Sequence, residues 1–223
     1  MGMKPWSFSS LGTFETCPLQ YKSKYIEKSY IEPPQEHLIH GTTTHAHLEN
    51  RMRDGTPLPH DYAEHEKWCE RLERLPRTTL LVEEKMGLTK GLQPTGFDSE
   101  DTWWRGVIDL AILDNNRAVI CDWKTSKKAK PDFTQLNLFA AAVFAKYPEI
   151  ETVKQMFIWL RLNKHSSEDF SRSGVAAFWT AMIPRVNRLE SAIETDNFFA
   201  KPSGLCSGWC YHPTCVYRKE KRK

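Results

Sequence analysis

The sequence RGVIDLAILDNNRAVICDWKT, residues 105–125, predicts two β-strands joined by a tight turn. Alternating apolar residues fill 105–113 and 117–125, and Asn115 and Asn116 stand between them. Asparagine tolerates the positive φ of a two-residue hairpin loop, which favours this turn. With this register, Asp109 faces Asp122 directly across the two strands. The hairpin therefore brings two carboxylates together inside runs that otherwise predict buried strands.

The second strand also decides which side chains share a face. Because successive side chains of a strand point to opposite faces, Asp122 and Lys124 share one face, while Cys121 and Trp123 share the other. Facing carboxylates destabilise a sheet unless a cation lies between them, and Mg²⁺ prefers such oxygen ligands. A lysine beside the ion can orient or deprotonate a bound water, or neutralise charge on a phosphate. The alternative is an ordinary solvent-facing pair at the strand ends, which the surrounding apolar residues disfavour.

Composition limits the class of protein. The chain has 223 residues, of which 40% are hydrophobic and 26% are charged, so it can bury a sizeable core. No apolar run approaches the ~18 residues that span a bilayer, and no signal-peptide core follows Met1. We therefore expect a cytoplasmic protein without a membrane partner. A net charge of +3 excludes a general polycation, and the basic tail 217–223 is either a solvated end or a nucleic-acid contact.

Outward from the hairpin, the sequence predicts further helices and strands. Helices are expected at 9–28 with a break at Pro18, at 41–55 behind capping threonines, at 131–148 and at 174–195, and strands at 79–88 and 153–162. In helix 131–148, Asp132 is the expected N-cap and Gln135 completes a capping box. This order predicts an α/β fold whose mixed central sheet is covered by helices on both faces. We expect one domain, 1–223, with a helical N-terminal part (1–76), a catalytic sheet core (77–165) and a C-terminal helix with a cysteine cap (166–223).

Five short motifs, in this order along the chain, resemble those of one nuclease family. SSLGTFETCPLQYKSKY (9–25) is similar to its opening motif, GTTTH (41–45) to its G-x-x-x-H motif, and GVID (106–109) with CDWKT (121–125) to its two nuclease motifs. QLNLF (135–139) resembles its Q-x-x-x-Y helix, with Phe139 in place of the usual tyrosine. The chain thus resembles the RecB-type branch of the PD-(D/E)XK superfamily, including phage-encoded exonucleases and CRISPR-associated adaptation nucleases. The resemblance implies a restriction-endonuclease-like core.

The resemblance also implies roles for individual residues. Metal would be bound by His45, Asp109, Asp122 and the Trp123 carbonyl; Asp109, Asp122, Lys124, Glu83 and Gln135 would form the catalytic set. The metal would be Mg²⁺ or Mn²⁺. In VEEK (82–85), the family pattern favours Glu83 over Glu84 as the glutamate near the metal. Gln135 would support the site or the DNA, and Lys124 would position or activate the attacking water.

Four of the six cysteines form a second candidate site. In related nucleases, one N-terminal and three C-terminal cysteines hold a 4Fe-4S cluster, which implies Cys17 with Cys206, Cys210 and Cys215 here. Three residues, instead of the usual two, separate Cys206 from Cys210. A zinc site of Cys206, Cys210, His212 and Cys215 is an alternative, and free thiols in a turn-rich cap are another. Each interpretation gives the cysteines a structural role.

Together these features predict a Mg²⁺- or Mn²⁺-dependent DNA nuclease, an exonuclease, that acts in recombination, repair, replication or phage DNA processing. The expected partner is single-stranded DNA or the ends of double-stranded DNA, with a homo-oligomer or a recombination protein as a further partner. If the chain is phage-encoded, its location would be the host cytoplasm. Lys127, Lys128 and Lys130 either meet the phosphate backbone or form a solvated loop. The competing function is a non-catalytic DNA-binding module of the same fold.

Overall fold

The computed structural model describes residues 4–219, which form two compact units. The first, here called the terminal unit, is made by the described residues up to Pro34 and from Trp179 onward. The second, here called the sheet unit, comprises Gln35–Phe178. No helix among the described residues is long and apolar enough to cross a membrane. The whole predicted sheet core of 77–165 lies in the sheet unit, and the division into one domain with three parts stays a prediction.

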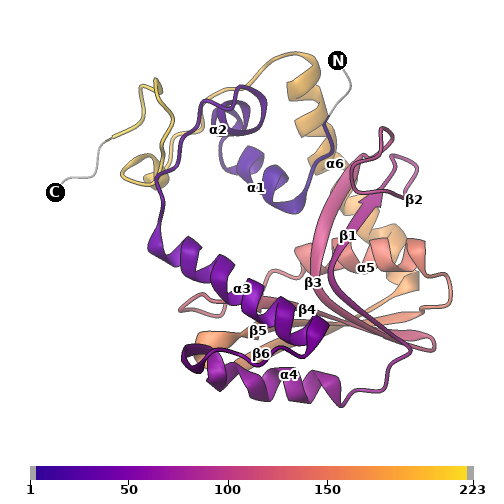
Figure 1. Cartoon of the computed structure of the whole chain (residues 1–223). Helices are drawn as coiled ribbons and strands as arrows, with labels where there is room; N and C mark the ends of the chain where they lie inside the picture. Colours follow the sequence, from indigo (N-terminus) through magenta and orange to yellow (C-terminus); the bar gives the residue numbers. More distant parts are fainter. Residues whose placement is uncertain (1–3, 220–223) are drawn as a thin grey trace. The chain divides into compact units, whose positions relative to one another are not determined.

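A mixed six-stranded sheet forms the centre of the sheet unit (Figure 1). The strand order is β2-β1-β3-β4-β5-β6, with β4 and β5 parallel and every other neighbouring pair antiparallel. The strands are β1 (Thr79–Leu88), β2 (Pro94–Thr95), β3 (Trp104–Asp114), β4 (Arg117–Lys124), β5 (Thr152–Trp159) and β6 (Lys164–Ser171). The central hairpin β3–β4 thus lies between β1 and the parallel strand β5.

Helices cover both faces of this sheet, as predicted. On one face, α3 (Glu36–Asp54) and α4 (Glu66–Glu73) bury Leu48 and Trp68 against Leu110 of β3 and Cys121 and Trp123 of β4. Fully burying such a side chain contributes ~1.5–3 kcal/mol. The opposite face carries α5 (Thr134–Lys146), whose N-terminal neighbour Phe133 packs on Phe157 of β5. Short 3₁₀ helices lie at His60–His65, Leu160–Leu162 and Arg172–Gly174.

The predicted hairpin register is confirmed. Asp114 pairs with Arg117 and Leu110 pairs with Cys121, so Asn115 and Asn116 form the loop, with Asn115 at φ +48°. The ladder between β3 and β4 ends at this last pair, directly before Asp109 and Asp122. The two strands therefore separate where the two carboxylates stand.

Other predicted boundaries are wrong for identifiable reasons. Helix α3 begins at Glu36, five residues before the predicted start, so the threonines lie within it and Thr44 bonds the His40 carbonyl at 2.7 Å. Gln135 makes no capping box because its side chain turns to Asp122. Strand 153–162 ends earlier, at Trp159. β2, α4 and β6 were not predicted; β6 (KHSSEDFS) is a polar edge strand without apolar alternation.

The terminal unit is helical. It contains α1 (Phe8–Thr16), α2 (Pro18–Tyr21), a short π-helix (Lys22–Ile26), most of α6 (Val175–Glu194) and a 3₁₀ turn (Gly204–Cys206). The break at Pro18 is confirmed, because α1 ends at Thr16 and the proline begins the next helix. Arg185 of α6 holds both carboxylate oxygens of Glu15 at 2.7 Å, which joins α1 to α6. This bidentate pair connects segments 170 residues apart in the chain.

Candidate active site

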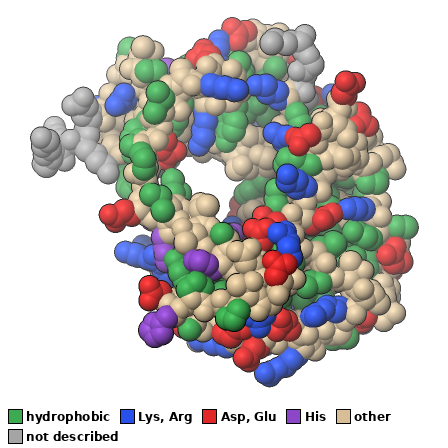
Figure 2. Space-filling view, in the orientation of Figure 1, with side chains coloured by type: hydrophobic (Ala, Val, Ile, Leu, Met, Phe, Trp, Pro, Cys, Tyr) green, Lys and Arg blue, Asp and Glu red, His purple; other side chains and the backbone are tan. Residues whose placement is uncertain are grey.

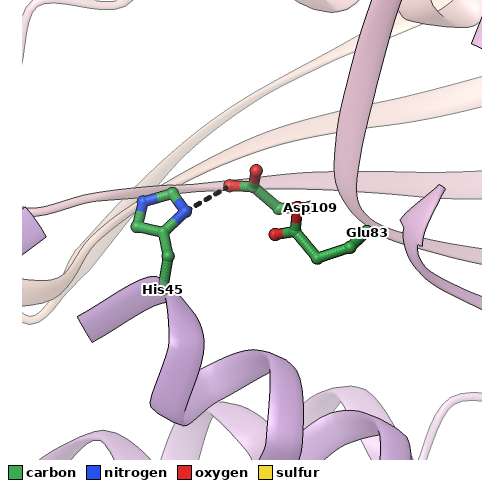
Figure 3. Close-up of side chains that lie close together, drawn as sticks. All are labelled: His45, Glu83 and Asp109. Carbon is green, nitrogen blue, oxygen red and sulfur yellow. Dashed lines mark ion pairs between the residues drawn. The ribbon is translucent and has the colours of Figure 1, made fainter. Parts of the chain in front are cut away.

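Three side chains converge where the β3–β4 ladder opens (Figure 3). His45 comes from the middle of α3, Glu83 from β1 and Asp109 from β3. One ligand atom from each residue lies within 4.8 Å of the other two. Figure 3 shows the imidazole and the Asp109 carboxylate facing each other, with the Glu83 carboxylate beside them. Side chains far apart in the sequence thus surround one point.

The hydrogen bonds of His45 determine which of its nitrogens faces the carboxylates. Its Nε2 lies 2.9 Å from the Trp123 carbonyl oxygen, and a carbonyl can only accept, so Nε2 carries the proton. Nδ1 then presents a lone pair 3.5 Å from Asp109 Oδ2. Burial lowers the pKa of His45, which favours the neutral ring. A neutral imidazole with a free Nδ1 is the form that binds metal ions.

Glu83 reaches the site through an unusual backbone conformation. Its φ is +51°, and it is skipped in the β1–β3 ladder although Val82 and Glu84 on either side both pair. A non-glycine residue in this region costs of order 1–3 kcal/mol and is typical of functional sites. Glu84 instead pairs with Lys146 of α5 at 2.6 Å. The structure thus places Glu83, and not Glu84, beside His45, which agrees with the residue that the family pattern favours.

Asp122 lies next to these three residues in a network of its own. Lys124 Nζ lies 2.6 Å from Asp122 Oδ2 and 3.3 Å from Gln135 Oε1, while Gln135 Nε2 donates to Asp122 Oδ1 at 3.1 Å. Lys124 also lies over the Phe157 ring at 5.3 Å. Asp122, Lys124 and Gln135 therefore share the α5 face of the sheet, as the alternation predicted. The mutually close group of His45, Glu83 and Asp109 does not include Asp122.

The carboxylates accumulate negative charge in a buried place. Burial, and next the charge of Asp122, raises the pKa of Asp109 well above its usual value. Burial also raises the pKa of Asp122, against the opposing effect of Lys124, and the pKa of Glu83, to which nearby Glu49 adds. A single hydrogen bond, from the Trp123 amide at 2.8 Å, supports the charged form of Asp109. Such a site binds a cation favourably, because the cation removes the repulsion that raises these pKa values.

The donor set fits a hard divalent ion. Mg²⁺ and Mn²⁺ prefer carboxylate oxygens, and Mn²⁺ also accepts imidazole nitrogen. Mg²⁺–oxygen bonds of ~2.0–2.1 Å place neighbouring ligand atoms ~3 Å apart and opposite ones ~4 Å apart. Atoms already within 4.8 Å of one another need only small side-chain movements to reach these separations.

Other residues singled out from the sequence lie as follows. The Trp123 carbonyl is at the site and accepts from His45. Trp103 and Trp104 are buried, as is Phe139, which packs on Trp104 with ring centroids 6.0 Å apart. Lys127, Lys128 and Lys130 are exposed in the loop after β4. Sequence reasoning missed Arg53, whose Nη2 donates to the Val82 carbonyl at 2.9 Å; its spacing of four residues from Glu49 was the available signal.

The four candidate cysteines line one cavity of the terminal unit. Cys17, Cys206, Cys210 and Cys215 border this cavity together with His212. Backbone N–H groups approach two of the sulfurs: Lys201 donates to Cys17 Sγ and Ser203 to Cys206 Sγ, both at 3.4 Å. Within residues 4–219, no three cysteine or histidine ligand atoms of this cavity lie within 4.8 Å of one another.

Fold and site together define a class of protein. A mixed sheet with helices on both faces, and an acidic site where its central hairpin opens, is the restriction-endonuclease-like fold. The chain belongs to the PD-(D/E)XK nuclease superfamily, whose family model matches residues 5–217.

Solved structures support the fold. A protein from Eubacterium rectale, described as a "Putative exonuclease", aligns with a TM-score of 0.56 and 10% identity over 95% of this chain and 89% of that one. The structure of SSO0001 aligns with a TM-score of 0.40 and 14% identity over 82% of this chain and 77% of that one. No curated protein sequence matches the chain.

Proposed function

We propose that the protein is a Mg²⁺- or Mn²⁺-dependent DNA exonuclease. The observation that carries this proposal is the convergence of His45, Glu83 and Asp109 beside the Asp122–Lys124 pair. Membership of the nuclease superfamily supports phosphodiester hydrolysis as the reaction. Retention of every acidic residue and of the lysine favours an enzyme over a DNA-binding module of the same fold.

The residues divide into two groups by what they contact. His45, Glu83 and Asp109 would hold the metal, with Asp122 and the Trp123 carbonyl at its edge. A bound divalent ion supplies Lewis acidity: it makes a water nucleophilic and offsets charge on the phosphate. His45 keeps its proton on Nε2 against Trp123, which directs Nδ1 inward. The Asp109 carboxylate is oriented by the Trp123 amide.

Lys124 and Gln135 act on the substrate side of this mechanism. The ammonium group is held by Asp122 Oδ2 and Gln135 Oε1, and a lysine has three donors, so one proton remains for a water or a phosphate oxygen. A donor fixed before the reaction stabilises the charge that develops on the phosphoryl oxygens without reorganisation. Gln135 joins both partners, so its removal should loosen both.

A cleavage assay tests this function. End-labelled linear DNA, single- and double-stranded, and covalently closed circular DNA are each incubated with Mn²⁺, with Mg²⁺ or with EDTA. We expect metal-dependent loss of linear DNA only, and no cleavage by Asp122→Ala or Lys124→Ala proteins that remain folded by circular dichroism. The control is Asp169→Ala, an exposed aspartate of the edge strand β6.

Three outcomes would contradict the proposal in different parts. Undiminished cleavage by Asp122→Ala would refute the mechanism. Cleavage of closed circles would show an endonuclease. Binding of DNA without cleavage under every metal condition would favour the non-catalytic module.

For the cysteines we propose a 4Fe-4S cluster held by Cys17, Cys206, Cys210 and Cys215. Zinc–sulfur bonds of ~2.3 Å place the ligands of a tetrahedral zinc site ~4 Å apart, closer than any three ligand atoms of this cavity. A cluster of four irons separates its ligands more widely. His212 Nδ1 accepts from the Thr214 amide at 3.3 Å, which weakens its case as a zinc ligand. Amide donors to the sulfurs also suit cluster-bound thiolates.

The cluster is tested on protein purified without oxygen. We expect visible absorption with iron and sulfide near four each per chain, lost in Cys17→Ser and kept in Cys121→Ser, because Cys121 is buried in the sheet unit. Colourless protein that contains zinc would contradict the cluster.

A further inference from the structure

The starting observation is a pair of backbone irregularities around Asp109. Glu83 and Asp109 would be partners in the β1–β3 ladder, yet this pair is missing while its neighbours Val82–Leu110 and Glu84–Ile108 are formed. Glu83 adopts φ +51°, a left-handed conformation that residues with a side chain rarely adopt. Such a conformation persists only where its surroundings hold it in place.

Arg53 supplies a contact that holds this conformation. Its Nη2 donates to the carbonyl of Val82, the peptide unit directly before Glu83, at 2.9 Å. Its Nη1 is paired with Glu49 Oε1 in the same helix. The guanidinium fork therefore spans a helical carboxylate and the strained strand, and a planar fork loses little freedom when both bonds form.

Helix α3 presents these residues together with the metal-ligand candidate. His45, Glu49 and Arg53 follow one another at intervals of four, so they lie along one side of the helix. Figure 2 shows acidic and basic side chains side by side over the C-terminal half of α3 and the bend of β1 and β3. One helix thus provides His45 directly and reaches the Glu83 backbone through Arg53.

We propose that Arg53, oriented by Glu49, is a positioning residue for Glu83. It holds the Val82–Glu83 peptide so that the Glu83 carboxylate points toward His45 and Asp109. This inference rests on the proposed metal-dependent function and adds to it a second contact from α3. Arg53 does not itself touch the substrate or the metal ligands' donor atoms.

The sign of the effect separates positioning from simple charge. Arg53 is a cation beside an acidic site, and its charge lowers the pKa of Glu83. On Coulomb grounds alone, its removal would strengthen the binding of a divalent cation. If Arg53 positions Glu83, its removal weakens binding instead.

The test measures Mn²⁺ affinity of the full chain by electron paramagnetic resonance and calorimetry, without DNA. We expect Arg53→Ala to weaken Mn²⁺ binding about 10–100-fold, the range for residues that orient metal ligands. Arg53→Lys keeps the charge and loses the fork, so it should recover only part of the affinity. The matched control is Arg74→Ala, because Arg74 pairs with Glu70 at the same spacing at the end of α4.

A double-mutant cycle shows whether Arg53 acts through Glu83. In a Glu83→Gln background, Arg53→Ala should cause little further loss, since the carboxylate that it positions is already gone. A crystal structure of Arg53→Ala should show the Val82–Glu83 peptide in an ordinary β conformation. Unchanged or tighter Mn²⁺ binding by folded Arg53→Ala, or additive losses in the cycle, would overturn the inference. Failure of the wild-type protein to bind Mn²⁺ or cleave DNA would instead refute the proposed function.

Discussion

Replacement of Asp109 by asparagine should stabilise the metal-free protein while it removes the metal site. The carboxyl group is buried beside Asp122, and both effects raise its pKa well above the usual value. Asparagine has nearly the same shape, and its side-chain oxygen can still accept the hydrogen bond that Asp109 Oδ2 takes from the Trp123 amide at 2.8 Å. The substitution therefore removes a repelled charge and keeps the local contact.

The size of the effect follows from linkage between pKa and folding. A pKa difference of one unit between folded and unfolded states corresponds to about 1.4 kcal/mol. For a chain of this size, 1 kcal/mol changes the melting temperature by about 2–4 °C, so each pKa unit removed raises it by about 3–6 °C. Mn²⁺ at 100 times its dissociation constant stabilises the wild-type protein by about 2.7 kcal/mol, or about 5–11 °C.

The pH dependence has a defined sign. Because the folded-state pKa of Asp109 is raised, its contribution to stability is fully present below the unfolded-state pKa. That contribution is lost as pH rises through the folded-state value. The advantage of Asp109→Asn over wild type in EDTA should therefore be larger at about pH 8 than at about pH 4.

Thermal unfolding by differential scanning fluorimetry, in EDTA and in Mn²⁺, gives all four values needed. Asp109→Asn should melt above wild type in EDTA and should gain little from Mn²⁺, so the order of the two proteins reverses when the metal is added. Asp169→Asn, an exposed aspartate on β6, controls for the chemistry of the substitution. A melting temperature below wild type in EDTA, or a full Mn²⁺ gain in the variant, would refute the reasoning.

Two further predictions test the site and the core. Glu83→Gln should weaken Mn²⁺ binding at least tenfold, whereas Glu84→Gln, which loses only the exposed pair with Lys146, should leave the affinity within about twofold of wild type by calorimetry. Gly106→Ala should cost about 1–3 kcal/mol in urea unfolding, because the added Cβ would lie 2.5 Å from Phe139 Cε1; a double substitution with Phe139→Leu should recover part of the loss.

The hairpin could be predicted because its determinants are local. Two asparagines set the turn, and the turn sets which residues face each other, so the pairing of Leu110 with Cys121 followed from the sequence. The same alternation placed Asp122 and Lys124 on one face, where Gln135 meets them. Site residues from the hairpin were therefore predictable together with their mutual arrangement.

Residues from outside the hairpin required more than periodicity. The motif resemblance pointed to His45 and favoured Glu83, yet no local signal indicated that Glu83 takes φ +51°. The polar edge strand β6 was missed because an exposed edge needs no apolar alternation. Gln135 was assigned to a helix cap because the pattern of a capping box is identical whether or not a site draws the side chain away.

The opening of the sheet at Asp109 explains how several carboxylates come together in a protein interior. Asp109 is paired in neither neighbouring ladder, because β1 skips it and the β4 ladder ends one residue earlier. Opening a ladder leaves buried backbone groups without partners, which costs as much as a lost hydrogen bond. Here side chains replace the missing bonds: Asp109 accepts from the Trp123 amide, His45 donates to the Trp123 carbonyl, and Arg53 donates to the Val82 carbonyl. The site is therefore formed by the same side chains that satisfy the opened backbone, so changes at either Asp109 or Arg53 should affect backbone geometry and metal affinity together.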